Sequence, residues 1–247
     1  MLDLFKKRPQ DRHEPETRGK KVYAIIPAAG SSRRMGGGNK LVMELGGQPI
    51  LCRTLRVFNA CDVIDGIILV CRRQDQKTYA SLCADWKIDK VAKIVEGGPS
   101  REHSVLNGVL ACGKEIGYVA IHDAARPLIT EDIIRETVEV AKRDSAAAPA
   151  VGVKDSIQRV QKGKMMENVD RETIMAVQTP QCFDIDLIRA ALTKAIDSGT
   201  SLTDDCGAVT KLGQPVSMTR GSYDNIKITT PEDVILGEVI LKGRSRR

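Results

Sequence analysis

The chain has 247 residues, of which 42% are hydrophobic and 28% charged, as is ordinary for a globular protein of one domain. Its formal net charge is +6, yet residues 1–21 carry seven Lys/Arg against four Asp/Glu, and residues 242–247 carry four more cations and no acid. The remaining body, residues 22–241, therefore has a net charge of −1, which argues against a nucleic-acid-binding groove.

Other classes of protein are disfavoured by pattern. The seven cysteines are scattered without a CxxC pair, so neither a zinc site nor a redox motif is indicated, and reduced cysteines fit the cytoplasm. The chain begins without an apolar signal segment, and no apolar run approaches the length of a membrane-spanning helix. We therefore expect a cytoplasmic protein that binds neither membrane nor nucleic acid.

The elements follow a simple order along the chain. Residues 1–21 are polar and contain two prolines, so we expect a disordered extension, and residues 242–247 form a basic tail. Between them, short apolar runs alternate with amphipathic stretches. Buried strands are expected at residues 22–26, 66–71, 91–95, 118–122 and 147–153, and helices at about 48–60, 73–85, 101–116 and 130–143. This alternation predicts an α/β fold, with a Rossmann-like, mostly parallel sheet flanked by helices in a single domain over residues 22–241.

Helix boundaries are marked by local signals. Thr130 precedes two acidic residues, and Thr230 precedes Pro231 and two acidic residues, which is typical of helix starts. Gly213 is placed to end a helix over residues 203–212.

The rhythm breaks at about 154–180, where the pattern alternates loosely around a Lys162-Gly163 turn. We expect a projecting β-hairpin arm. Because such an arm buries little against its own body, it often packs on a second subunit, but a plain surface hairpin accounts for the pattern equally well.

One loop carries most of the chemical signal. Residues 27–40 follow the first expected strand and contain small residues, then Arg33 and Arg34, three glycines and Lys40. Small residues let backbone N–H groups approach phosphate oxygens, and Arg and Lys supply charge there. The loop has neither the Walker A pattern nor GxGxxG. A flexible surface loop is the alternative, but the position after the first buried strand favours phosphate binding.

Further candidates lie where other strands end. Asp123 could hold a ribose hydroxyl or a magnesium-bound water, with Arg126 as its support, although a local ion pair would look the same. Residues 97–104 could line a base or ribose, and Ser100 fits a helix N-cap there. Residues 224–229 are expected to form a short late strand on which Lys227 could face the same cleft, or simply be solvated. Ligands of parallel sheets bind at such strand ends.

Several chemistries lack their residues. No GxSxG elbow is present, so a serine hydrolase is disfavoured. No histidine, cysteine or carboxylate cluster indicates a dedicated metal cage. Magnesium held mainly by substrate phosphates stays open, because it needs few protein ligands.

Taken together, the motifs resemble the 2-C-methyl-D-erythritol 4-phosphate cytidylyltransferases of the non-mevalonate isoprenoid pathway. The matching stretches occur in family order from about residue 22 to 241: PAAGSSRRMG with Lys40, GGPSREHSV, HDAARP, DRETIMAVQTPQCF, TDD, and DNIKIT followed by PED. Each piece is weak alone, whereas the ordered set is specific.

This resemblance implies a nucleotidyltransferase fold of the nucleotide-diphospho-sugar transferase type, a homodimer joined through the arm, and the substrates CTP and methylerythritol phosphate with a divalent cation, normally Mg²⁺. By motif, Arg34 and Lys40 would stabilise the transition state. Arg171, reaching across from the partner subunit, and Lys227 would position the acceptor phosphate. The remaining implied contacts are Ala28, Ala29, Gly30, Ser31, Gly98 and Ser104 to CTP, Asp123 and Asp224 in the metal and substrate region, and Thr179 near the acceptor.

Two departures and two alternatives accompany the resemblance. Asn39 and Pro99 stand where many members have proline and an acid, so the rigidity of the first loop and a side-chain contact to the nucleotide are in question. A ribitol 5-phosphate cytidylyltransferase is the nearest alternative, but such enzymes more often have Ser-Val at 124–125 and depart from the Asp170-Arg171 pattern. The other alternative is a non-catalytic nucleotide-binding module, against which the intact Arg and Lys residues speak.

Overall fold

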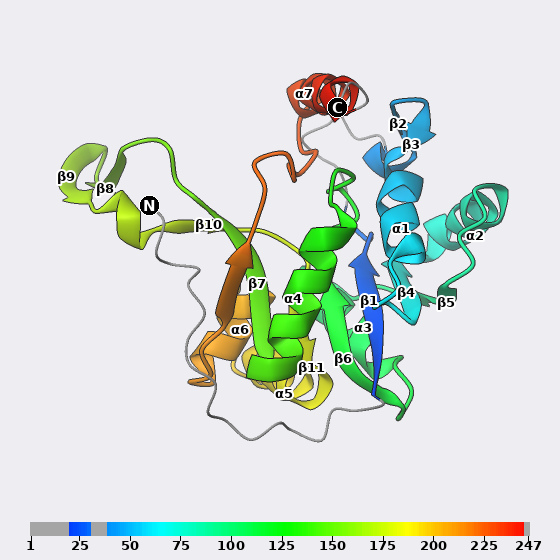
Figure 1. Ribbon diagram of the computed structural model, residues 1–247. Helices are drawn as coiled ribbons and strands as arrows, with labels where there is room; N and C mark the ends of the chain where they lie inside the picture. Colours follow the sequence, from blue (N-terminus) through cyan, green and yellow to red (C-terminus); the bar gives the residue numbers. More distant parts are fainter. Residues whose placement is uncertain (1–19, 31–38, 245–247) are drawn as a thin grey trace.

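The computed structural model of the chain describes residues 20–30 and 39–244. Most of the expected disordered extension, residues 1–19, and the end of the basic tail lie outside these ranges, but Lys21 of that extension already belongs to the first strand. Eight strands form the central sheet, in the order β10-β7-β11-β6-β1-β4-β5, with β12 on β7 (Figure 1). The predicted α/β fold with a mostly parallel sheet is therefore confirmed.

The sheet has a parallel half and a mixed half. The parallel strands are β1 (Lys21–Pro27), β4 (Gly66–Cys71), β5 (Val91–Glu96) and β6 (Ile116–Ile121). β11 (Gln181–Asp184) runs antiparallel to both β6 and β7 (Ala146–Gly152). β10 (Met175–Val177) is antiparallel to β7, and β12 (Ser217–Arg220) is parallel to it.

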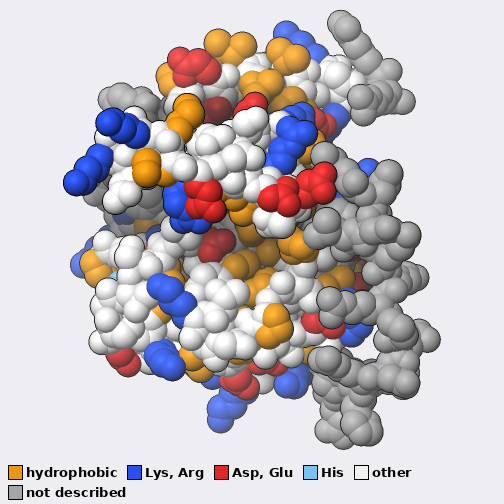
Figure 2. All heavy atoms as spheres, turned by 90° about the vertical axis from the view of Figure 1, so that its left-hand side faces the viewer, with side chains coloured by type: hydrophobic (Ala, Val, Ile, Leu, Met, Phe, Trp, Pro, Cys, Tyr) orange, Lys and Arg blue, Asp and Glu red, His pale blue; other side chains and the backbone are white. Residues whose placement is uncertain are grey.

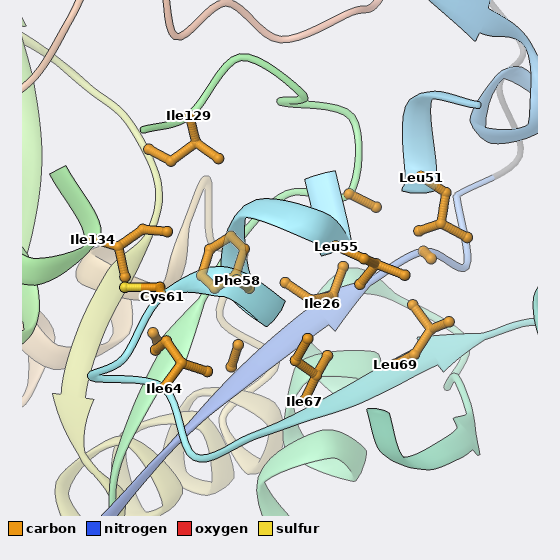
Figure 3. Packing of buried hydrophobic residues seen from close by; sticks show 14 of the residues in the cluster. Ile26, Leu51, Leu55, Phe58, Cys61, Ile64, Ile67, Leu69, Ile129 and Ile134 are labelled. Atoms are coloured by element: carbon orange, nitrogen blue, oxygen red, sulfur yellow. The ribbon is translucent and has the colours of Figure 1, made fainter. Parts of the chain in front are cut away.

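Helices cover both faces of the sheet, because alternate residues of its central strands are apolar on both sides. Ala24 and Ile26 face α1 (Ile50–Ala60), α2 (Gln76–Asp85) and α4 (Glu131–Asp144). Ile25 faces α3 (Arg101–Leu110), α5 (Ile185–Asp197) and α6 (Asp205–Lys211). On the first face, α1 lays its apolar side on β1 and β4 through Leu51, Leu55 and Phe58 against Ile26, Ile67 and Leu69 (Figure 3). Burial on both faces explains why these strands are continuous apolar runs.

The last helix, α7 (Pro231–Arg244), lies beyond the carboxyl ends of the parallel strands (Figure 1). It packs on the short strand β2 (Glu44–Leu45), which pairs with β3 (Gln48–Pro49). Its start follows the predicted Thr230-Pro231 signal, and Asp233 accepts hydrogen bonds from the backbone N–H groups of Thr229 and Thr230, at 2.7 and 2.8 Å. No helix in the described ranges is long and apolar enough to cross a membrane.

The hairpin after β7 is formed by β8 (Ile157–Gln161) and β9 (Lys164–Val169), which pair with each other and lie away from the central sheet (Figure 1). Lys162 and Gly163 both have positive φ, 48° and 75°, as a two-residue hairpin turn requires. The projecting arm is shorter than the expected residues 154–180, because β10 already belongs to the central sheet.

Three sequence expectations were wrong. The helix expected to reach residue 116 ends at Leu110, since residues 111–115 turn into β6. β5 is half exposed rather than buried, because it is the edge strand of the sheet. Residues 224–229 form no strand but an irregular loop that hydrogen-bonds to other loops, for example from Ile228 N to Ala125 O at 2.8 Å.

Candidate functional site

The carboxyl ends of the parallel strands bring three loops to one edge of the sheet. Ala28 N donates to Val70 O at 2.6 Å, Gly97 N to Cys71 O at 2.9 Å, and His122 N to Ile25 O at 2.9 Å, so each loop is held by the neighbouring strand. This is the edge at which sheets of this kind bind ligands.

The loop after β1 packs on the glycine pair after β5. A Cβ atom on Gly97 would lie 2.8 Å from Ala29 Cβ and 2.9 Å from Ser104 Oγ, so only glycine fits there. Gly98 N donates to Ser104 Oγ at 3.1 Å. Ser100 caps α3, as predicted, and this helix presents its positive end to the same place. Ala29, Gly98 and Ser104 therefore lie together, with Ala28 and Gly30 adjoining, beside the positive end of α3, which favours an anion.

Lys40 enters from the other side of the glycine-rich loop. It begins the 3₁₀-helix η2 (Lys40–Val42), and its Nζ donates to Ile228 O at 2.6 Å. Asn39, one of the two departures, caps η2 by accepting from Leu41 N at 3.1 Å and also hydrogen-bonds to the Tyr79 hydroxyl. An anchored asparagine therefore fixes this end of the loop where many relatives of the resembled family have proline.

Asp123 is the electrostatic centre of the edge. Its carboxylate, 12% exposed, is 2.9 Å from Lys227 Nζ and 3.3 Å from Arg126 Nε. Burial acts to raise the pKa of Asp123, but Lys227, Arg101 and Arg126 outweigh it and lower this pKa to about 2. The carboxylate is thus ionised at neutral pH. Its ion pair with Lys227 fixes the direction in which the half-exposed Lys227 ammonium points.

His122, next to Asp123, is fully buried and ties the site loops together. Its Nδ1 lies 3.0 Å from Thr179 Oγ1 and its Nε2 lies 3.2 Å from Arg126 O. Because a carbonyl can only accept, Nε2 carries the proton and Nδ1 accepts from the Thr179 hydroxyl. That hydroxyl oxygen in turn accepts from Asp123 N at 3.2 Å. Burial lowers the pKa of His122 to about 4, which keeps the ring neutral.

Not every predicted residue joins this group. Arg171 lies on η4 (Arg171–Thr173) at the base of the hairpin and donates to Lys154 O at 3.1 Å. Asp224 faces Arg244, at 3.6 Å, rather than Asp123. Ser31 and Arg34 lie outside the described residues. Within those residues, no three His, Cys, Asp or Glu side chains form a metal-binding group.

An ion pair beside the site was missed in the sequence. Arg101, at the start of α3, donates two hydrogen bonds to the buried carboxylate of Asp205, at 2.8 and 2.7 Å. Gln181 accepts from Asp205 N at 3.0 Å and donates to Asp204 at 2.8 Å. The signal was present in the TDD stretch, but nothing in one sequence says which cation such an acid meets.

A separate cavity of about 300 Å³ lies between α2 and β5, lined by Cys83, Ile88 and Ile94 among others. None of the candidate residues lines it. The convergent polar groups at the strand ends, and not this apolar hollow, mark the candidate site.

Comparisons with known proteins agree with this geometry. Residues 22–243 match the family model described as "IspD: 2-C-methyl-D-erythritol 4-phosphate cytidylyltransferase". A protein of that name from Halalkalibacterium halodurans is 44% identical over 224 residues, which are 90% of this chain and 98% of the relative. One from Geobacillus kaustophilus is 43% identical over 90% and 97% of the two chains. The crystal structure of 4-diphosphocytidyl-2C-methyl-D-erythritol synthase from Anaerococcus prevotii has a TM-score of 0.82 at 31% identity, covering 91% of this chain and 97% of that one.

Proposed function

This chain belongs to the 2-C-methyl-D-erythritol 4-phosphate cytidylyltransferase family, and from that premise we propose which of its residues carry each part of the reaction. The enzyme transfers the cytidylyl group of CTP to 2-C-methyl-D-erythritol 4-phosphate, giving CDP-methylerythritol and pyrophosphate. We assign the acceptor phosphate to the cluster of Asp123, Lys227 and Arg126. In this cluster Asp123 holds the Lys227 ammonium group at the edge where the strands end.

The chemistry needs no activated side-chain nucleophile. An oxygen of the acceptor phosphate, already anionic near neutral pH, attacks the α-phosphorus of CTP, and the bond from that phosphorus to the oxygen bridging to the β-phosphate breaks. Pyrophosphate leaves with the bonding electrons. The main obstacle is bringing an anion to a polyanion, so positioning and charge stabilisation carry the catalysis.

The cations divide between the two ends of the site. Lys40 and Arg34 offset the charge that builds on the α-phosphate and the leaving pyrophosphate. Lys227, aimed by Asp123, makes a point contact with the acceptor phosphate, and Arg171 grips two of its oxygens with its planar guanidinium. Thr179 adjoins the acceptor. CTP would contact Ala28, Ala29, Gly30, Ser31, Gly98 and Ser104, with the last two near its base or ribose.

A divalent cation, normally Mg²⁺, fits this site as a partner of the phosphates. Asp123 offers a hard oxygen ligand that stays ionised at neutral pH, but it already meets Lys227 and Arg126. Asp224, on the loop of residues 221–230, would be a second oxygen ligand, although it faces Arg244 at 3.6 Å in the structure. We therefore assign most of the coordination to phosphate oxygens and water, as Mg²⁺ tolerates. When bound, the ion would neutralise phosphate charge.

The hairpin arm, β8 and β9, supplies the dimer contact in this proposal. Its side chains Val160, Met165 and Met166 are 59, 78 and 60% exposed, which is unusual for apolar residues on so small an element. A partner subunit would cover them and receive Arg171 at the acceptor phosphate. Cations and anions are interspersed over the face seen in Figure 2, so no single-sign patch suggests nucleic acid. A cytoplasmic enzyme acting on phosphorylated metabolites fits these features.

Pyrophosphate release tests the proposal. The protein is incubated with CTP and Mg²⁺ and either methylerythritol phosphate or ribitol 5-phosphate. Release with the first acceptor alone is the expected result, and release with ribitol 5-phosphate alone would overturn the acceptor assignment. Lys227→Ala should raise the KM for the acceptor with little change in the KM for CTP. Lys211→Ala, a surface lysine bonded to Ser201 O, is the matched control.

A further inference from the structure

The loop that carries Asp224 and Lys227 has no regular structure of its own. Residues 221–230 belong to no helix or strand, so no sheet ladder sets the position of Lys227. Its geometry must come from bonds to its surroundings. Gly221 N donates to Ala150 O at 3.0 Å at the start of the loop, and a Cβ atom there would lie 2.8 Å from Gln178 Oε1, so the close approach requires glycine.

Gln178 clamps this loop as a strand would. Its Nε2 donates to Ser222 O at 2.8 Å, and its Oε1 accepts from Ser222 N at 3.3 Å. The side-chain amide thus satisfies both backbone groups of one residue. Gln178 is buried and directly precedes Thr179. Its two hydrogen bonds to Ser222 therefore join the loop of residues 221–230 to the chain segment that carries Thr179.

Asn225 joins a third segment to these two. Its side chain is fully buried, and Nδ2 donates to Thr179 O at 3.0 Å and to Gln178 Oε1 at 3.3 Å. Its backbone oxygen accepts from Arg126 Nη1 at 2.7 Å, and Arg126 is one of the two cations on Asp123. One residue therefore connects the loops of Asp123, Thr179 and Lys227.

The Asn225 side chain also has one buried atom, the acceptor Oδ1, that makes no hydrogen bond within the described residues. Leaving a buried acceptor unpaired costs free energy, and an apolar residue of similar size would avoid the cost. Stability alone therefore does not explain an asparagine here, whereas its two donated bonds into the site loops do. Natural sequences break such local rules mainly at functional sites.

We propose that Asn225, assisted by Gln178, is a positioning residue for the acceptor phosphate: it holds the loop so that the Lys227 ammonium stays opposite Asp123. This inference rests on the proposed role of Lys227. Asn225 touches no reacting atom and acts through Lys227. Without the Asn225 side chain, Lys227 is still present, but its ammonium group is no longer held opposite Asp123. Acceptor binding then weakens, while the CTP end of the site stays intact.

Steady-state kinetics of the full chain test this. Asn225→Ala is expected to raise the acceptor KM about tenfold, as the loss of one or two buried hydrogen bonds would, with the KM for CTP changed less than about threefold. Gln178→Ala should act in the same direction and keeps the test valid if Asn225→Ala does not fold. Asn59→Ala is the control, because it also removes a side-chain bond to backbone, to Lys90 N, far from the site. Equal rises in both KM values would overturn the proposal.

A double-mutant cycle separates the positioning role from general damage. In a Lys227→Ala background, Asn225→Ala should add almost nothing to the acceptor KM, since the side chain that it positions is gone. Fully additive effects would refute the coupling. The two proposals fail differently: an unchanged acceptor KM in Lys227→Ala alone overturns the role of Lys227, whereas a raised KM there with a normal Asn225→Ala overturns only the role of Asn225.

Discussion

His122 makes the stability of this enzyme depend on pH in a defined window. Its ring is fully buried against Phe58, with ring centroids 4.9 Å apart, and its two nitrogens are used by Thr179 and Arg126. A proton on Nδ1 would lose the bond from the Thr179 hydroxyl and place a charge in the core. The folded protein therefore resists protonation, with a pKa of about 4 against an ordinary value of 6.5.

The sign and size follow from proton linkage. Between these two pKa values the unfolded chain binds more protons than the folded one, so stability falls as the pH falls through the window. The stability that depends on a neutral His122 is fully present above the pKa of the unfolded chain, 6.5. It is lost progressively as the pH falls toward the pKa of the folded protein, about 4. Lowering the pH from neutral to about 4.5 should cost about 2.5 kcal/mol through this residue alone. Asp123, with its lowered pKa, contributes stability that is lost only as the pH falls from its ordinary value of 3.8 through about 2, which is a separate window.

Urea unfolding at several pH values between neutral and about 4.5 measures the effect, with His122→Asn as the comparison. Asparagine keeps an acceptor toward Thr179 but cannot titrate. The variant is expected to be less stable at neutral pH, yet its stability should fall less on acidification than that of the parent, by about 2 kcal/mol. Parallel pH profiles for the two proteins would refute the reasoning, because they would mean that His122 exchanges its proton as easily folded as unfolded.

Three further outcomes are expected. Lys40→Ala should lower kcat on the order of a hundredfold with little change in the KM for CTP, measured by pyrophosphate release, since it removes a group that acts on transition-state charge. Met165→Asp on the arm should shift the proposed homodimer to monomers in analytical ultracentrifugation and raise the acceptor KM, while an unchanged sedimentation coefficient would exclude the arm as a dimer contact. Gly213→Ala should cost about 1 kcal/mol in urea unfolding, because Gly213 has φ of 87° after α6, and full stability would show that this turn relaxes freely.

The parallel half of the fold was predictable from sequence because each element has its own signal. Continuous apolar runs gave β1, β4 and β6, and the caps gave the starts of α3, α4 and α7. In the mixed half, β7 was expected, but the short strands β10, β11 and β12 were not, since they have too few residues for a period to register. α5 also went unassigned, although Asp184 caps it by accepting from two backbone N–H groups. Edge exposure of β5 depends on strand order, which no local pattern contains.

The site was predictable as a list of residues and less so as a geometry. Motifs at expected strand ends named Asp123 and Lys227, the family resemblance added Thr179, and the structure places these three in one bonded group. The loop conformation of Lys227 was mispredicted as a strand, because Ile226 and Ile228 alternate with polar neighbours as strand residues do. The bonds that replace a strand come from side chains distant in sequence, and a single sequence does not reveal such pairs.

Those side chains also explain how the cations of the candidate site are held in place. Asp123 and Thr179 follow and precede the paired strands β6 and β11, whereas Lys227 lies on a loop outside the sheet. His122 joins the first two through its ring, and Asn225 joins the third through its amide, both from buried positions. Because His122 and Asn225 are neutral, they link these segments without adding charge next to Asp123. The positive charges of Lys227 and Arg126 are therefore not offset by these two linking side chains. A charged residue at either buried position would either repel an anionic acceptor or neutralise the cations that we propose bind it. Neutral side chains that each make two hydrogen bonds therefore suit both the stability of the fold, which a buried charge would lower, and the proposed binding of an anionic acceptor.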